Sequence, residues 1–195
     1  MYLYLVRHGQ SEGNVVRTFH GQTDYPLTEK GRQDARQAAE KLRDISFARC
    51  LSSDLIRARD TAEACVEGRG IPVECCPALR EQDVGEMEGL SWDEMGTRFP
   101  GLRERYLEDW YHTQPPGGEH PEAMMARVAA LLDELTAADE DVLLVGHFGS
   151  FGLVLEHLGL VEKGKNFEPG YLFGQGTYTA IRLEDGKAEL VCFNR

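Results

Sequence analysis

The chain has 195 residues, of which 42% are hydrophobic and 28% are charged. This length and composition exclude a disordered chain and a small disulfide-stapled scaffold, and we expect a single domain over residues 1–195. Lys and Arg number 21 against 33 Asp and Glu, which gives a net charge of -12. Such a charge disfavours binding to nucleic acid or to an anionic membrane surface.

The cysteine pattern and the N-terminus bear on where the protein works. The 5 cysteines are an odd number with no C-x-x-C pair, which favours reduced thiols over a disulfide framework or a zinc site. The apolar residues before Arg7 are too few for a signal peptide, and no apolar run approaches the roughly 18 residues of a membrane span. We therefore expect a cytoplasmic protein without a membrane partner. The sequence leaves the oligomeric state open.

The first half of the chain alternates apolar strands with amphipathic helices. Thr28 is the predicted N-cap of the first helix, and Ser53-Asp54 is the predicted cap of the second. Gly68 and Gly70 are stop signals for that second helix. The predicted elements are a strand at 2–6, a helix from Leu27 to Leu42, a strand at Phe47–Leu51, a helix from Ser53 through Cys65, and a strand at Pro72–Cys76.

The second half continues the alternation after a helical segment. A capping box, Ser91-x-x-Glu94, opens a helix near Trp92, and Pro100 separates it from a second helix over Leu102–Trp110. We interpret this segment as an insertion that covers another part of the molecule. The remaining predicted elements are a helix from Pro121 with an apolar stripe to Leu135, a strand at Val142–Val145, a buried helix over Phe151–Leu158, and a hairpin of Tyr178–Leu183 and Ala188–Phe193.

The order of these elements predicts the fold class. Strands and helices alternate for most of the chain, and the last two strands form a hairpin with Asp-Gly at its turn. We therefore expect an α/β fold, a three-layer sandwich with a mainly parallel central sheet and an antiparallel edge.

Several familiar motifs are only partly present. A P-loop pattern at residues 159–165 is followed by Asn166, where a Ser or Thr is needed to hold Mg²⁺. Gly174-x-Gly176 lacks the third glycine of a dinucleotide-binding loop. Ser150 lacks the glycine two residues earlier that a serine hydrolase elbow requires, because Phe148 stands there. These classes of protein are therefore poorly supported.

Two histidines follow predicted apolar strands. His8 comes after the strand at 2–6, and His147 comes after the strand at Val142–Val145. The carboxyl ends of parallel strands share the edge at which α/β sheets place their ligand crevice. We expect the same edge to receive Arg7, Arg57 and Glu81.

These residue types are sufficient to transfer a phosphoryl group without a metal ion. Guanidinium groups donate paired hydrogen bonds to phosphate oxygens. One imidazole can attack phosphorus, and a carboxylic acid can protonate the departing oxygen. A histidine after a strand is also a common structural loop residue, and Glu81 is one of 33 acidic residues. Spacing alone therefore leaves both interpretations open.

The segment Leu5-Val6-Arg7-His8-Gly9-Gln10-Ser11-Glu12-Gly13-Asn14 resembles the signature of the histidine phosphatase superfamily, the phosphoglycerate-mutase-like proteins. The defining element of this family is Arg-His-Gly after the first strand. Further matches follow in the family's order over nearly the whole chain: Gly21 with Pro26-Leu27-Thr28-Glu29-Lys30-Gly31, Ser52-Ser53-Asp54-Leu55-x-Arg57-Ala58-x-x-Thr61-Ala62, Leu79-Arg80-Glu81 with Gly85-x-x-Glu88-Gly89, Pro116-Gly117-Gly118-Glu119, and Val145-Gly146-His147.

The resemblance implies a role for each matching residue. His8 would be the nucleophile that becomes phosphorylated, and Glu81 would donate and later accept a proton. The residues that would hold the phosphate are Arg7, Arg57 and His147. The matching positions on the substrate side are Asn14, His20, Gly21 and Phe148. No metal ion and no cofactor is implied, and the ligand would be a small phosphorylated metabolite. Because the attacking nitrogen of His8 must be unprotonated, we expect a backbone carbonyl to accept a hydrogen bond from its other ring nitrogen.

The family contains more than one activity. The segment between Glu81 and His147 is short compared with that of the glycolytic mutases, which favours a phosphomonoester hydrolase. The compact length and the Pro-Pro-Gly-Gly-Glu loop resemble the α-ribazole phosphatase and broad-specificity phosphatase branch. Alternatives are a phosphoglycerate mutase and a non-catalytic phosphate-binding relative. Three positions depart from the family pattern: Phe148 replaces the usual glycine, Met87 a common aromatic residue, and His120 a common small hydroxyl residue.

Overall fold

A six-stranded sheet in the order β3-β2-β4-β1-β5-β6 forms the centre of the computed structural model, which describes residues 1–165 and 169–195. Strands β1 to β4 run parallel, whereas β5 pairs antiparallel with both β1 and β6. This arrangement confirms the predicted fold class. The strands are β1 (Tyr2–Arg7), β2 (Arg49–Ser52), β3 (Val73–Cys75), β4 (Val142–Gly146), β5 (Thr179–Glu184) and β6 (Lys187–Cys192).

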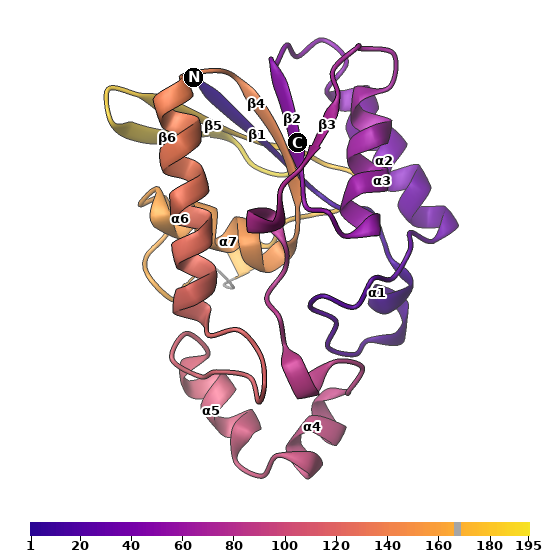
Figure 1. Cartoon of the computed structure of the whole chain (residues 1–195), viewed down its shortest axis with the longest axis vertical. Coiled ribbons are helices and arrows are strands. Elements are labelled where there is room, and N and C mark those ends of the chain that lie inside the picture. Colours follow the sequence, from indigo (N-terminus) through magenta and orange to yellow (C-terminus); the bar gives the residue numbers. More distant parts are fainter. Residues whose placement is uncertain (166–168) are drawn as a thin grey trace.

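Helices cover both faces of the sheet, as Figure 1 shows. Helices α2 and α3 pack on one face, and α6 and α7 pack on the other, while α4 and α5 lie beyond one end of the sheet. Their bounds are α1 (Glu12–Val16), α2 (Glu29–Lys41), α3 (Ile56–Val66), α4 (Trp92–Arg98), α5 (Leu102–Asp109), α6 (Pro121–Ala138) and α7 (Phe148–His157); 3₁₀ turns are η1 (Pro77–Leu79), η2 (Gly85–Met87) and η3 (Pro169–Tyr171).

Successive residues of the central strands point to opposite helical layers, because side chains alternate along a strand. In β1, Leu5 belongs to the core under α6 and α7, and Val6 belongs to the core under α2 and α3. In β4, Leu144 and Val145 divide in the same way. Burial on both faces explains why these strands read as continuous apolar runs in the sequence.

Two of the predicted helix caps are confirmed and one is wrong. Thr28 Oγ1 accepts the backbone N–H of Gly31, and Ser91 forms a reciprocal capping box with Glu94. Helix α3 begins one or two residues later than Ser53-Asp54 predicts, with Leu55 at its N-cap and no side-chain cap. The physical reason is that both polar side chains have other partners: Ser53 contacts His147, and the Asp54 carboxylate accepts two hydrogen bonds from Arg80.

His120, which replaces a small hydroxyl residue of the family pattern, has a local structural role. Its Nδ1 accepts the backbone N–H of Glu122 at 3.1 Å and caps α6, and Pro121 takes the first turn as predicted. The sequence did not indicate α1 or the 3₁₀ turns, because elements this short have no periodic pattern. Asn166, which interrupts the P-loop pattern, lies outside the described residues.

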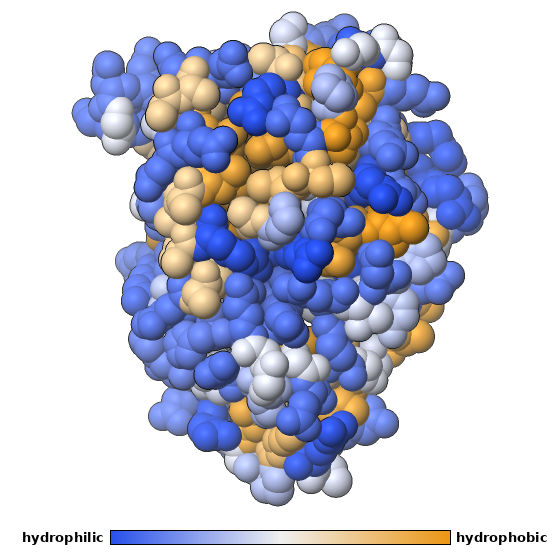
Figure 2. Space-filling model, in the orientation of Figure 1, coloured by the Kyte–Doolittle hydropathy of each residue, from blue (hydrophilic) through white to orange (hydrophobic). Residues whose placement is uncertain are grey.

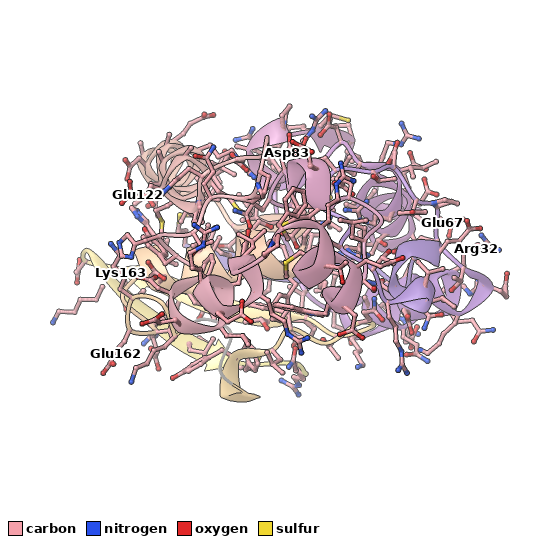
Figure 3. All side chains as sticks on the ribbon, turned by 90° about the horizontal axis from the view of Figure 1, so that it is seen from below. Arg32, Glu67, Asp83, Glu122, Glu162 and Lys163 are labelled. Carbon is pink, nitrogen blue, oxygen red and sulfur yellow. The ribbon has the colours of Figure 1, made fainter. Side chains whose placement is uncertain are left out.

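The visible face of the molecule is mixed in polarity. Most of the face in Figure 2 is hydrophilic, and apolar residues show in its upper half and again at the lower end, over α4 and α5. Viewed from below in Figure 3, these helices lie across the centre, and the labelled charged side chains point outward around the rim. Within the described residues, no helix has the length and apolar character that crossing a membrane would require.

Candidate active site

Three polar side chains meet at the carboxyl ends of neighbouring parallel strands. The register pairs Arg7 of β1 with Gly146 of β4, so the next residues, His8 and His147, leave the sheet side by side. Their ring centroids are 5.0 Å apart. Strand β2 pairs with the other side of β4, which places Ser53 next to the same point. The sequence prediction that both histidines share one edge is confirmed.

His8 is buried, and a backbone carbonyl fixes its ring. Its Nδ1 lies 2.7 Å from the carbonyl oxygen of Gly9. A carbonyl oxygen can only accept a hydrogen bond, so Nδ1 carries the ring proton and Nε2 keeps a free electron pair. Burial, followed by the charges of Arg7 and Arg57, holds the pKa of His8 well below its usual value. His8 is therefore a neutral imidazole at neutral pH, as the sequence analysis expects of a nucleophile.

Two arginines place positive charge beside His8. Arg57 is completely buried and donates to the carbonyl oxygens of Gly21 and Thr23, at 2.7 and 2.9 Å. Arg7 donates to the Phe173 carbonyl at 3.0 Å. Burial lowers the pKa of both guanidinium groups, and the Glu81 charge opposes that effect. Each guanidinium has five N–H donors, so both keep donors for a ligand.

Buried polar atoms without partners gather at this place. Buried polar groups in proteins are nearly always hydrogen-bonded, so each exception needs a cause. The guanidinium Nε atoms of Arg7 and Arg57 are among these exceptions, and Nε is a donor only. Acceptor oxygens of an anion would satisfy both. The complete set within the described residues is Arg7 Nε, Thr18 Oγ1, Arg57 Nε, Tyr106 Oη and His147 Nδ1.

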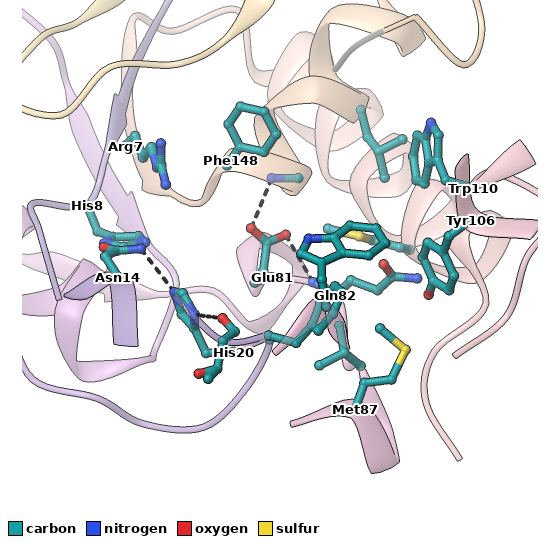
Figure 4. Close-up of a pocket in the computed structure, with 18 of the residues that line it drawn as sticks. Arg7, His8, Asn14, His20, Glu81, Gln82, Met87, Tyr106, Trp110 and Phe148 are labelled. Atoms are coloured by element: carbon teal, nitrogen blue, oxygen red, sulfur yellow. Dashed lines mark hydrogen bonds between the residues drawn. The ribbon is translucent and has the colours of Figure 1, made fainter. Parts of the chain in front are cut away.

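Glu81 faces this cluster from the loop that follows β3 and η1. One carboxylate oxygen accepts the backbone N–H of Gly149 at 3.0 Å, and the other accepts the N–H of Gln82 at 3.1 Å. Figure 4 shows this carboxylate on the opposite side of the space from His8 and Arg7. Sequence reasoning missed Gly149, although its place two residues after His147 on a helix N-terminus was a usable signal.

An ion pair that the sequence analysis did not identify anchors the Glu81 loop. Arg127 of α6 holds the Glu119 carboxylate through Nε and Nη2, at 2.8 and 2.9 Å. The same guanidinium donates to the backbone carbonyls of Ala78 and Glu81, at 2.6 and 3.2 Å. These contacts join segments that are distant in the chain. The spacing of residues in the sequence therefore could not predict this role of Arg127.

The residues predicted on the substrate side form a second linked group. His20 Nδ1 lies 2.8 Å from the Thr18 carbonyl oxygen, and its Nε2 lies 3.0 Å from Asn14 Nδ2. These contacts match an imidazole protonated on Nδ1 that accepts from the Asn14 amide. Gly21 is a glycine because of close approach: a Cβ there would lie 1.9 Å from the Gln82 carbonyl oxygen.

These groups open into one cavity of about 540 Å³. The helices α4 and α5 contribute Trp92, Tyr106 and Leu107 to its wall, which confirms that the inserted segment covers another part of the molecule. His147 is not among the residues that line this cavity, although its ring lies against that of His8, with centroids 5.0 Å apart. The predicted site residues that do line it are Arg7, His8, Asn14, His20, Gly21, Arg57, Glu81 and Phe148. Phe148 also packs under the Arg7 guanidinium, 5.3 Å from its ring centroid.

Among the described residues, the other reactive groups do not form a comparable site. The described residues contain no group of three or more His, Cys, Asp or Glu side chains placed to hold a metal ion. Cys50 and Cys65 are free and buried, and burial raises the pKa of each thiol to about 12. They therefore remain protonated at neutral pH.

Comparison with known proteins agrees with this geometry. The family model of the histidine phosphatase superfamily (branch 1) matches residues 3–195. The chain is 32% identical to the adenosylcobalamin/alpha-ribazole phosphatase of Salmonella typhimurium, over 100% of this chain and 96% of that protein. It is 36% identical to the probable phosphoglycerate mutase GpmB of Enterobacter sp., over 82% of this chain and 76% of that protein.

Solved structures extend the likeness. The alpha-ribazole phosphatase of Shigella flexneri has a TM-score of 0.93 at 28% identity, covering 100% of this chain and 96% of that one. The mycobacterial glucosyl-3-phosphoglycerate phosphatase in complex with VO3 has a TM-score of 0.87 at 32% identity, covering 99% and 98%. With the family model spanning nearly every residue, the chain belongs to branch 1 of the histidine phosphatase superfamily.

Proposed function

We propose that the protein is a phosphomonoester hydrolase that works through a phosphohistidine on His8 and needs no metal ion. The main support for this proposal is the set of groups that surround His8 Nε2. An unprotonated ring nitrogen lies beside two arginines whose buried Nε donors have no partner. Phosphoryl transfer depends mainly on positioning and on fixed positive charge, and the arginines supply both.

The first half of the reaction moves the phosphoryl group onto the protein. The His8 Nε2 electron pair attacks phosphorus, and the bond from phosphorus to the ester oxygen breaks. Glu81, as a carboxylic acid, gives its proton to that oxygen, and the alcohol leaves. The Gly9 carbonyl continues to accept from Nδ1, which supports the positive charge that the ring gains.

The second half regenerates the free protein. Glu81 is now a carboxylate and takes a proton from a water molecule, whose oxygen attacks the phosphorus. The bond from phosphorus to nitrogen breaks, and its electron pair returns to His8 Nε2. Inorganic phosphate leaves. Arg7 and Arg57 hold the equatorial oxygens through both halves, so their contacts need not be remade.

The cavity wall beyond the phosphate end favours an uncharged, flat leaving group. Apart from Arg7 and Arg57, no lysine or arginine lines it within the described residues, whereas aromatic side chains do. Phosphoglycerate carries a carboxylate that would need a cation there, and α-ribazole 5'-phosphate carries a benzimidazole that would not. The names of the Salmonella and Shigella relatives point to the same ester. We therefore take α-ribazole 5'-phosphate as the first substrate to test.

The function is tested by trapping the intermediate. After rapid mixing with a radiolabelled phosphomonoester and quenching in base, the wild-type chain should carry label that acid releases, as a phosphorus–nitrogen bond requires. His8→Ala should carry none and should lose hydrolysis of p-nitrophenyl phosphate. His112→Ala is the matched control, because His112 is exposed and pairs with Asp109 outside the cavity. Near-normal turnover by His8→Ala would refute the proposal.

Substrate choice is tested with a pair of esters that share one leaving oxygen. α-Ribazole 5'-phosphate and ribose 5-phosphate differ only in the planar base, whose burial is worth a factor on the order of 30 in kcat/KM. Equal values for the two would remove α-ribazole phosphate from consideration without contradicting the proposed hydrolase activity.

The relatives named as probable phosphoglycerate mutases support a second candidate, a mutase. That activity would show as interconversion of phosphoglycerates, dependent on a bisphosphate primer, with little release of phosphate.

A further inference from the structure

Ser53 is buried next to His147 and is not part of the mechanism above. It follows β2 at the edge where His147 follows β4, and its backbone N–H donates to the Val145 carbonyl at 2.9 Å. This backbone contact ties the two loops together. The Ser53 side-chain oxygen then lies 2.8 Å from His147 Nε2, and both residues are completely inaccessible to solvent.

The hydrogen atoms at this contact can be placed by counting donors and acceptors. A serine hydroxyl has one proton to donate. Ser53 Oγ accepts the Leu55 backbone N–H at 3.3 Å, and its other hydrogen-bond partner is His147 Nε2. If Nε2 carried the ring proton, the Ser53 hydroxyl proton would be buried without an acceptor. In the opposite direction the hydroxyl donates to Nε2, and the only proton left without an acceptor is the one on His147 Nδ1, which an oxygen of a bound phosphate can accept.

We propose that Ser53 is a positioning residue that donates to His147 Nε2 and so keeps the ring proton on Nδ1, where it serves as a donor to the phosphate oxygens. The proposal rests on the proposed function, because it takes phosphate as the ligand. His147 Nδ1 is buried and has no partner, and the same holds for Nε of Arg7 and Arg57. A proton on Nδ1 adds a third donor to this group, whereas an electron pair there would repel an anion.

The environment of His147 makes its tautomer important for phosphate binding. Burial and then the neighbouring His8, Arg57, Arg7 and Arg127 hold the pKa of His147 well below its usual value. The free protein therefore holds a neutral ring with one proton, and that proton resides either on Nδ1 or on Nε2. Without Ser53 as a donor, nothing in the described contacts of His147 favours the nitrogen that a phosphate would need.

The tautomer is measured directly by two-bond ¹H–¹⁵N NMR spectra of the histidine rings, with and without inorganic phosphate. In the wild-type chain His147 should be protonated on Nδ1 alone. Ser53→Ala should shift the ring toward the Nε2-protonated form. Ser52→Ala is the control, because Ser52 is equally buried but its hydroxyl donates to a backbone carbonyl. A wild-type ring protonated on Nε2, or no change in Ser53→Ala, would overturn the proposal.

A double-mutant cycle separates positioning from a structural role. Ser53→Ala should weaken phosphate binding and kcat/KM for p-nitrophenyl phosphate by roughly 10-fold, the loss of about one hydrogen bond. In a His147→Ala background the same change should cost nothing further, and Ser53→Thr should retain the wild-type tautomer. An equal cost in both backgrounds would contradict the proposal. Because the NMR and phosphate-binding measurements need no turnover, they decide on Ser53 even if the protein proves not to be a hydrolase.

Discussion

Gly149 and Glu81, 68 residues apart in the chain, are in direct contact: the glycine N–H donates to a carboxylate oxygen at 3.0 Å. A Cβ at residue 149 would lie 2.3 Å from the other carboxylate oxygen. No carbon and oxygen atoms approach so closely without a bond, so only glycine allows the first turn of α7 to meet the carboxylate. The N-terminus of this helix also places partial positive charge beside Glu81.

We therefore expect Gly149→Ala to displace Glu81 and to impair proton transfer to the leaving oxygen. For an alkyl ester such as ribose 5-phosphate, kcat/KM should fall about 100-fold, which is the lower range for general acid catalysis. Steady-state phosphate release measures the effect. Gly96→Ala in α4 is the control, since its Cβ would meet only the Arg103 side chain, at 3.8 Å. Similar losses in the two variants would contradict this role of Gly149.

Replacing Glu81, the proposed acid, should make the loss of activity depend on the leaving group. Glu81→Gln retains the size of the side chain but has no proton to give, so alkyl phosphates should lose at least about 100-fold in kcat/KM. p-Nitrophenyl phosphate should lose far less, because its leaving oxygen departs as a stable anion. The exposed Glu86, which pairs with Arg98, provides the control Glu86→Gln. If both esters lost the same factor, Glu81 would not be the acid.

The two buried histidines should make the free protein less stable in mild acid. Burial holds the pKa of His8 and His147 well below the ordinary value of 6.5. Below pH 6.5 the unfolded chain therefore binds protons that the folded chain does not bind. The contribution of the two histidines to the unfolding free energy is fully present above pH 6.5 and is lost as the pH falls toward their folded-state pKa values. Each histidine contributes up to about 1.4 kcal/mol per pH unit in that window.

Chemical unfolding at pH values from 7.5 to 5 checks this expectation. His147→Gln removes one of the two groups and should reduce the slope of unfolding free energy against pH, whereas His112→Ala, at an exposed site, should leave the slope unchanged. A slope that stayed the same in His147→Gln would show that this histidine takes up its proton in the folded protein.

The ion pair of Arg127 and Glu119 should stabilise the fold and the site together. Both side chains are largely covered, with 21% and 18% exposed, and Arg127 also donates to two backbone carbonyls. Breaking a partly buried pair leaves a carboxylate without its partner, so Arg127→Ala should cost about 2–4 kcal/mol of unfolding free energy. Because the Glu81 loop loses its anchor, kcat/KM should fall as well.

The matched control for Arg127 is Arg98→Ala. The pair of Arg98 and Glu86 is exposed, at 54% and 56%, and such pairs contribute less than about 1 kcal/mol. Thermal and urea unfolding of both variants, together with p-nitrophenyl phosphate kinetics, compare the two pairs. Equal, small effects on stability and activity would mean that the Glu81 loop holds its position without Arg127.

Local pattern and register account for much of what could be predicted. The apolar run at 2–6 and that at Val142–Val145 identify strands whatever surrounds them, and a histidine stands two residues after the end of each run. Parallel pairing then brings His8 and His147 to one edge. The cap at Ser53-Asp54 could not be predicted correctly, because His147 and Arg80, both distant in sequence, occupy those side chains.

By itself, the amino-acid sequence determined the periodic elements, the α/β alternation and the set of residues at the strand ends, because these depend on neighbours along the chain. Only the tertiary structure decided why residue 149 is glycine, which arginine anchors the Glu81 loop, and which side chain lies against His147. Those properties depend on contacts of about 3 Å between segments up to 94 residues apart, such as Ser53 and His147. Such distances are set by the packing of the whole domain, and no local spacing encodes them.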